Sequence, residues 1–99
     1  MSMQEMLSDR AKVHGDWAEN ADIAQRIKDA LHSGSSWPRM APYMREACDL
    51  IALKLSRLVS GDWTYDDHIR DIAGYAIRAA ESLDAAKSKL GSAHKIGGE

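Results

Sequence analysis

The chain has 99 residues, which is the size of a single domain with a modest hydrophobic core. Its 13 Lys and Arg residues against 15 Asp and Glu residues give a net charge of -2, which argues against nucleic-acid binding by bulk electrostatics. The single cysteine, Cys48, excludes an internal disulfide, and no stretch resembles a signal peptide or the ~20 apolar residues of a membrane span. We therefore expect a cytoplasmic protein with no membrane association.

Two helices are predicted in the first third of the chain. The first covers about residues 3–14, where apolar residues recur at helical spacing, and it ends before Gly15, a residue type common just past a helix end. The second covers residues 16–32 and begins at Asp16, with Glu19 three positions later as in a capping box. Its apolar face consists of Ile23, Ile27, Ala30 and Leu31.

A loop rich in Ser, Gly and Pro precedes the third predicted helix. Pro42 suits the first turn of that helix, which is predicted to end at Gly61. Thr64 is predicted to cap a fourth helix, with Asp67 at the third position. No segment has the pattern of a strand, so the fold class is all-α, a compact four-helix bundle.

The fourth helix is predicted to end at about Leu90, before Gly91. This divides the chain into one helical domain over residues 1–90 and a flexible C-terminal tail over residues 91–99.

The third and fourth helices each have an apolar face and a polar row. On the third helix the core face is predicted to be Ala47, Ile51, Leu55 and Leu58, and the polar row Glu46, Asp49 and Arg57, with Lys54 at its border. On the fourth helix the core face is predicted to be Ile69, Ile72, Ala76, Ala80 and Leu83, and the polar row Asp67, Asp71, Gly74 and Arg78, with Tyr75 beside it.

A tight reversal near Gly61 predicts that the last two helices form an antiparallel hairpin. In such a hairpin, facing positions have numbers that add up to roughly 123 to 127, which places Lys54 near Asp71. By the same count Glu46 and Asp49 lie roughly 8 to 11 Å along the axis from Asp71. One Mg²⁺ shared within the hairpin is therefore disfavoured, and a site that joins Asp71 to acids of another helix or subunit is favoured.

Pairs of acids followed by bases are typical of one kind of chemistry. Mg²⁺ prefers oxygen ligands and is often held by a few carboxylates together with substrate phosphates. The predicted metal ligands are Glu46, Asp49, Asp67 and Asp71, and the predicted catalytic residues are Glu46, Asp49 and Asp71. The predicted phosphate-binding residues are Lys54, Arg57 and Arg78.

The segments "HGDWAENADIAQRIK", "REACDLIALKLSRLVSGD" and "DDHIRDIAGYA" resemble a small phage and bacterial family of helical proteins related to the MazG-like all-α nucleoside triphosphate pyrophosphohydrolases. The resemblance covers about residues 6–80. It implies an oligomeric, Mg²⁺-dependent enzyme of the bacterium or infected host cell that releases pyrophosphate from a nucleotide. The family's E-x-x-E pair corresponds to Glu46 and Asp49, and its final Asp to Asp71. His68 occupies the place of the second-helix Glu.

Each candidate also has a structural interpretation. Asp16 and Asp67 are typical helix-start acids, His14 a typical helix-end residue, and Lys54 and Arg57 plausible ion-pair partners. The secondary site candidates are His14, Asp16, His68 and Tyr75. Two functions remain open: the pyrophosphohydrolase, and a non-catalytic helical module that binds a nucleotide or a host protein, such as a small phage accessory or anti-defence factor. The broad apolar faces further predict a homo-oligomer.

Overall fold

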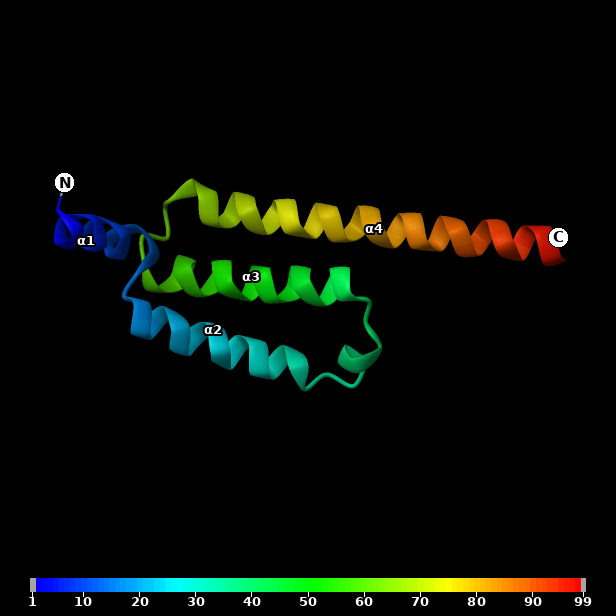
Figure 1. The fold of residues 1–99 in the computed structure, drawn as a ribbon, viewed down its shortest axis with the longest axis horizontal. Coiled ribbons are helices and arrows are strands. Elements are labelled where there is room, and N and C mark those ends of the chain that lie inside the picture. The colour runs from blue at the N-terminus through cyan, green and yellow to red at the C-terminus, as the bar shows by residue number, and fades with distance from the viewer. Residues whose placement is uncertain (1, 99) are drawn as a thin grey trace.

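The computed structural model describes the backbone of residues 2–98 and the side chains as far as Leu90. It contains four α-helices and one short 3-10 helix, in the order α1 Met3–His14, α2 Trp17–His32, η1 Trp37–Arg39, α3 Pro42–Ser60 and α4 Asp66–Gly98 (Figure 1). No strand occurs between residues 2 and 98. The all-α prediction is therefore confirmed. Among the helices searched in this part of the chain, none has the length and apolarity to cross a membrane.

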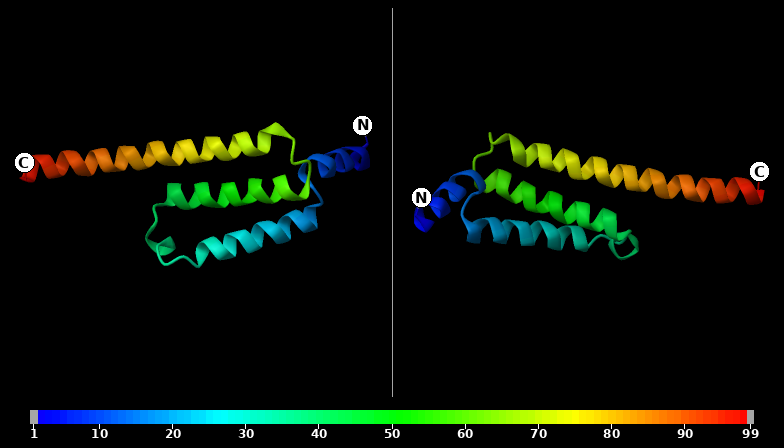
Figure 2. Two further views of the ribbon diagram at one scale, coloured as in Figure 1. Left: turned by 180° about the vertical axis from the view of Figure 1, so that it is seen from behind. Right: turned by 45° about the horizontal axis from the view of Figure 1, so that its top comes forward.

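Three of the helices form a single layer. Helices α2, α3 and α4 lie side by side with α3 in the middle, and α1 projects from the end where α2 begins (Figures 1 and 2). The molecule measures 64 × 27 × 22 Å and its radius of gyration is 18.2 Å, against about 13 Å for a globular chain of 100 residues. The molecule is therefore elongated, and the prediction that the helices form a compact bundle is wrong. Helix α1 buries none of its residues.

The core consists of small side chains. The buried apolar residues among those described are Ala24, Ala47, Ala52 and Ala79. Alanine lets helix backbones approach closely, but it removes little apolar surface from water. Three polar residues are also buried: Asn20, Ser56 and His68. The Ser56 hydroxyl donates to the Asn20 side-chain oxygen, which satisfies one pair of these polar groups in the interior.

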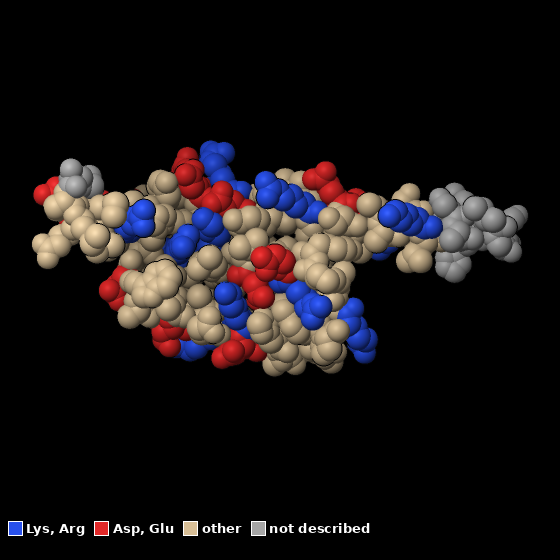
Figure 3. All heavy atoms as spheres, viewed as in Figure 1, with Lys and Arg blue, Asp and Glu red and all other residues tan. Residues whose placement is uncertain are grey.

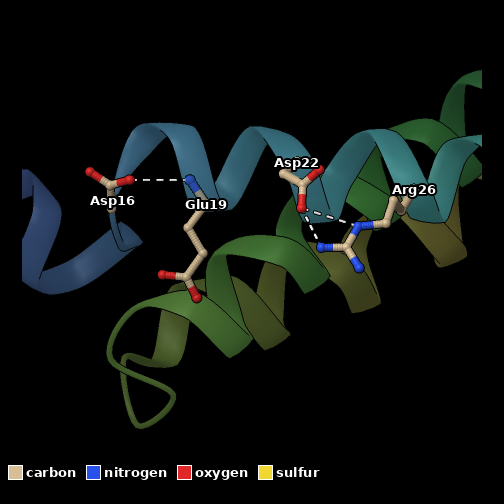
Figure 4. Close-up of polar contacts among 4 residues, drawn as sticks. All are labelled: Asp16, Glu19, Asp22 and Arg26. Atoms are coloured by element: carbon tan, nitrogen blue, oxygen red, sulfur yellow. Dashed lines mark hydrogen bonds and ion pairs between the residues drawn. The ribbon is translucent and has the colours of Figure 1, made fainter.

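The predicted start of α2 is confirmed. The backbone nitrogen of Glu19 donates to Asp16 Oδ2 at 3.1 Å, which satisfies a free donor of the first turn (Figure 4). The Glu19 side chain extends away from Asp16, so only half of a capping box forms. One turn further along, Arg26 Nε donates to Asp22 at 3.1 Å. This ion pair is exposed and lies on the surface of α2.

The start of α4 differs from the prediction. The Thr64 hydroxyl donates to Asp62 Oδ1 at 2.6 Å, and the Thr64 backbone nitrogen donates to the same oxygen at 3.0 Å. Asp62 therefore closes the turn, and the Thr64 hydroxyl does not cap α4, which begins at Asp66. The predicted end at Leu90 is also wrong, because α4 continues to Gly98 and one glycine within a helix costs only about 1 kcal/mol. The flexibility of the tail stays a prediction.

The antiparallel hairpin of α3 and α4 is confirmed, but α4 is rotated from the predicted orientation. The side turned to α3 carries His68, Tyr75 and Ala79, of which His68 and Ala79 are buried. The predicted core residues Ile69, Ala76 and Ala80 are exposed instead. His68 can face inward because its Nε2 lies 3.2 Å from the Val13 carbonyl oxygen, a bond that offsets the cost of burying the ring.

Two turns touch where the four helices meet. Gly15 joins α1 to α2 at a φ of 86°, and Gly61 follows α3. A Cβ at Gly61 would meet the Val13 oxygen and lie 2.6 Å from the Gly15 nitrogen. The Asp62 nitrogen donates to the Val13 oxygen at 3.1 Å. We call this contact between residues 13–15 and 60–62 the junction.

We predict that Gly61→Ala destabilises the chain by at least about 2 kcal/mol, because the added methyl group would collide with backbone atoms that cannot move independently. Gly74→Ala is the matched control: it lies within α4 and its Cβ would meet nothing within 4 Å, so it should stabilise by roughly 0.5 to 1 kcal/mol. Urea unfolding of both variants measures the difference. Equal stability of the two variants would contradict the close contact at the junction.

Candidate functional site

The predicted site residues lie in two separate places. Glu46, Tyr75 and Arg78 line a groove of about 220 Å³ between α3 and α4. This agrees with the predicted hairpin register, because the numbers 46 and 78 add up to 124, within the predicted range for facing positions. Asp49 turns the other way, and its Oδ1 lies 2.8 Å from Nε2 of His32 on α2.

The other predicted residues lie at the junction end of the hairpin. Lys54 Nζ is 2.8 Å from Asp71 Oδ2, an ion pair that confirms the predicted register. The hydrogen bond from Lys54 holds the pKa of Asp71 below its ordinary value of 3.8. The Tyr65 hydroxyl donates to Asp67 at 3.0 Å, and this bond raises the pKa of Tyr65. Both acids therefore already have partners.

The four predicted metal ligands do not come together as one set. Glu46 lines the α3–α4 groove, Asp49 contacts His32, Asp67 contacts Tyr65 and Asp71 contacts Lys54. Within the part of the chain that was searched, no three His, Cys, Asp or Glu side chains are placed to hold one metal ion. As a set, these residues do not fit Mg²⁺ within one chain.

Three aromatic side chains meet at the junction. The His14 and His68 ring centroids are 5.1 Å apart, and the Tyr65 and His68 centroids are also 5.1 Å apart, both with edge-on geometry. The Val13 carbonyl can only accept, so Nε2 of His68 is the donor in their hydrogen bond. This leaves Nδ1 of His68 buried and without a partner among the described residues.

Two further buried nitrogens beside this cluster have no hydrogen-bond partner in the described part of the chain. They are Nδ1 of His14 and Nε of Arg57. Buried polar atoms are nearly always paired, so an unpaired guanidinium nitrogen and two unpaired imidazole nitrogens close together are unusual. Such atoms take their partners from water or from a bound ligand.

Next to these nitrogens is a cleft of about 590 Å³. Helix α1 contributes Arg10 and His14, α2 contributes Trp17 and Asn20, and α3 contributes Arg57. On the face drawn in Figure 3, basic side chains lie over the region where α1 joins the other helices. Asn20 links α2 to the end of α1 at the edge of this cleft, because its Nδ2 donates to the His14 carbonyl oxygen at 3.0 Å. We call this cavity the junction cleft.

The charge of the junction cleft affects its histidine. Burial lowers the pKa of His14 below its ordinary value of 6.5, and the charge of Arg57 lowers it further. His14 is therefore held neutral at neutral pH, where it can accept or donate one hydrogen bond. The cleft lining carries two arginines, Arg10 and Arg57, against one carboxylate, that of Asp16, and this excess of positive charge suits an anionic ligand.

Part of this site follows from the sequence. The predicted phosphate-binding residue Arg57 and the secondary candidates His14 and Asp16 line the cleft, whereas Lys54 and His68 do not. Arg10 and Asn20 are not among the predicted residues, because neither belongs to the polar rows of the third and fourth helices. The signal that could have found Asn20 is its position on the same side of α2 as Ile23 and Ile27, where a polar residue needs a buried partner.

No family model, curated protein or solved structure matches the chain. The MazG-like relationship therefore stays a prediction, and the functional argument depends on the junction cleft itself.

The lowered pKa of His14 predicts a pH dependence of stability. The unfolded chain binds more protons than the folded chain below about pH 6.5, so stability is complete above that value and falls as the pH decreases. His14→Gln should flatten this decline between pH 7 and 5, measured as the urea midpoint at each pH. His32→Gln, which removes an imidazole far from the junction, should retain the decline. An unchanged profile in His14→Gln would contradict the assignment.

Proposed function

We propose that the protein binds a nucleotide or a nucleotide-like phosphate ester in the junction cleft. The observation that carries this proposal is the Arg57 side chain, whose buried Nε has no partner among the described residues and which lines the cleft with Arg10 and His14. The guanidinium group has donors arranged in a fork that match the oxygens of a phosphate. An anion in the cleft would accept hydrogen bonds from the guanidinium group of Arg57.

The size and lining of the junction cleft suit such a ligand. Small-molecule sites typically enclose about 300 to 1,000 Å³, and this cleft measures about 590 Å³. Trp17 is 76% exposed and lines the cleft, where its indole can stack on a flat base. In this arrangement Arg10 and Arg57 bind the phosphates, His14 adds a neutral hydrogen bond, and Trp17 contacts the base.

Arg57→Gln tests this proposal directly. We expect calorimetric titration with ATP, dATP and inorganic pyrophosphate to show binding by the unmodified chain, and Arg57→Gln to weaken it at least about tenfold, since a charged hydrogen bond contributes roughly 1.5 to 3 kcal/mol. Arg26→Gln is the matched control, because Arg26 is an exposed arginine of α2 paired with Asp22. It should bind like the unmodified chain.

Either of two results would contradict nucleotide binding. The first is no binding of any of the three ligands at millimolar concentration. The second is equal weakening by Arg57→Gln and Arg26→Gln, which would indicate nonspecific charge attraction. The alternative of a helical module that binds a host protein would then be favoured.

Hydrolysis of the nucleotide to release pyrophosphate is the second candidate function, and the resemblance to MazG-like enzymes implies it. Asp71 forms an ion pair with Lys54, about one turn of α3 from Arg57, so a carboxylate lies at the same end of the hairpin as the junction cleft, although neither residue of the pair lines the cleft. Mg²⁺ commonly takes only one or two carboxylates when substrate phosphates supply further oxygens. The metal would provide charge neutralisation for the phosphates when bound.

Asp71→Asn separates binding from hydrolysis. We expect a panel of ribo- and deoxynucleotides with Mg²⁺ or Mn²⁺ to yield pyrophosphate rather than phosphate if the chain is an enzyme, and Asp71→Asn to abolish the product while nucleotide binding persists. Asp66→Asn is the control, because Asp66 is an exposed acid in the first turn of the same helix. Binding without any product in the unmodified chain would leave a non-catalytic nucleotide-binding module as the function.

A further inference from the structure

Helix α4 has an apolar stripe on the side that faces away from α3. Ile69 is 55% exposed and Ile77 is 59% exposed. The alanines between them are exposed as well: Ala73, Ala76 and Ala80. At about 100° per residue these five residues span roughly 100° of the helix surface. We call them the outer stripe.

The outer stripe has charged residues at both of its ends, and all are exposed. Asp66 precedes Ile69, the first residue of the stripe, and Arg70 comes directly after it, whereas Asp84 and Lys87 follow Ala80, the last residue. An acid and a base therefore lie near each end of the stripe. A second copy of α4 in the opposite direction, centred between Ala76 and Ile77, aligns residues whose numbers add up to about 153. Asp66 then lies level with Lys87, and Arg70 with Asp84.

A parallel copy would bring every charge level with the same charge, which is unfavourable. The antiparallel copy gives each acid a base, and the two-fold symmetry repeats each pair. The small side chains also agree with this register, because Ala73 lies level with Ala80 and lets the helix axes approach to about 8 Å. The two isoleucines of each copy then fill the space beside the alanines.

We infer that the outer stripe is the interface of a homodimer in which two α4 helices pack antiparallel. The charge pattern complements itself, so the occupant is a second copy of this chain and not an unrelated protein. The paired segment extends from Asp66 to Lys87, about 32 Å of helix. This inference is independent of the nucleotide proposal, because the outer stripe shares no residue with the junction cleft.

Ala76→Asp tests the interface, with Ala85→Asp as its matched control. Both alanines are exposed on α4, but Ala85 lies about 140° around the helix from the centre of the outer stripe. We expect light scattering of the unmodified chain at tens of micromolar to give twice the 10.9 kDa chain mass. Ala76→Asp should raise the dimer dissociation constant at least about 100-fold, because it places two unpaired carboxylates at the centre. Ala85→Asp should leave it unchanged.

The charged pairs test the register. Lys87→Glu should weaken the dimer, and adding Asp66→Lys should restore it, whereas Lys89→Glu on the opposite side of α4 should have no effect. Disulfide formation tests the direction in a Cys48→Ala background. Asp66→Cys mixed with Lys87→Cys should cross-link between chains, and Asp66→Cys alone should not, because its two copies are about 31 Å apart along the axis.

Three results would overturn the inference. They are a monomer mass at tens of micromolar, a dimer equally sensitive to Ala76→Asp and Ala85→Asp, and self-cross-linking of Asp66→Cys. The last result would indicate a parallel pair, and the second a dimer formed through another surface.

Discussion

The backbone of the turn between α1 and α2 lies directly against the backbone that follows α3, because neither Gly15 nor Gly61 has a side chain. A Cβ on Gly15 would lie 2.6 Å from the Ser60 carbonyl, and a Cβ on Gly61 would lie 2.6 Å from the Gly15 nitrogen. This contact brings the end of α1, the start of α2, the end of α3 and the start of α4 to one place. The junction cleft exists because of it, since α1, α2 and α3 each contribute part of the cleft wall.

Polar contacts fix how the helices meet at the junction. The fully buried apolar residues are alanines, and the half-buried leucines and isoleucines of α3 and α4 add apolar contact that has no preferred direction. The Val13 carbonyl oxygen accepts from the Asp62 nitrogen and from Nε2 of His68, which ties α4 to the end of α1. A buried histidine without that acceptor would cost several kcal/mol. The inward position of His68 on α4 is thus matched by a hydrogen bond to the end of α1.

Features that depend on neighbouring residues could be predicted from the sequence, whereas features that depend on how distant helices pack could not. Asp16 as the cap of α2, Pro42 in the first turn of α3 and the Lys54–Asp71 pair all follow from chemistry or geometry within a short stretch, and all are confirmed. The core face of α4 does not follow in this way. The apolar periodicity predicts that Ile69 lies in the core, because isoleucine is apolar. It does not show that His68 has a hydrogen-bond acceptor, the Val13 carbonyl oxygen, on α1. The same limit applies to the junction cleft, whose residues come from three helices and carry no common spacing.

In the proposed dimer, the two junction clefts lie at opposite ends and each is complete within its own chain. Asp71 is about 200° around α4 from Ile69, so it faces away from the outer stripe and toward Lys54. A second copy bound to the outer stripe therefore brings none of its acids to Asp71. If Asp71 takes part in binding a metal ion, the remaining oxygens must come from the nucleotide phosphates, from water or from the same chain. Assembly through α4 and ligand binding at the junction are thus separate properties of this fold, and a variant that disrupts one leaves the residues of the other in place.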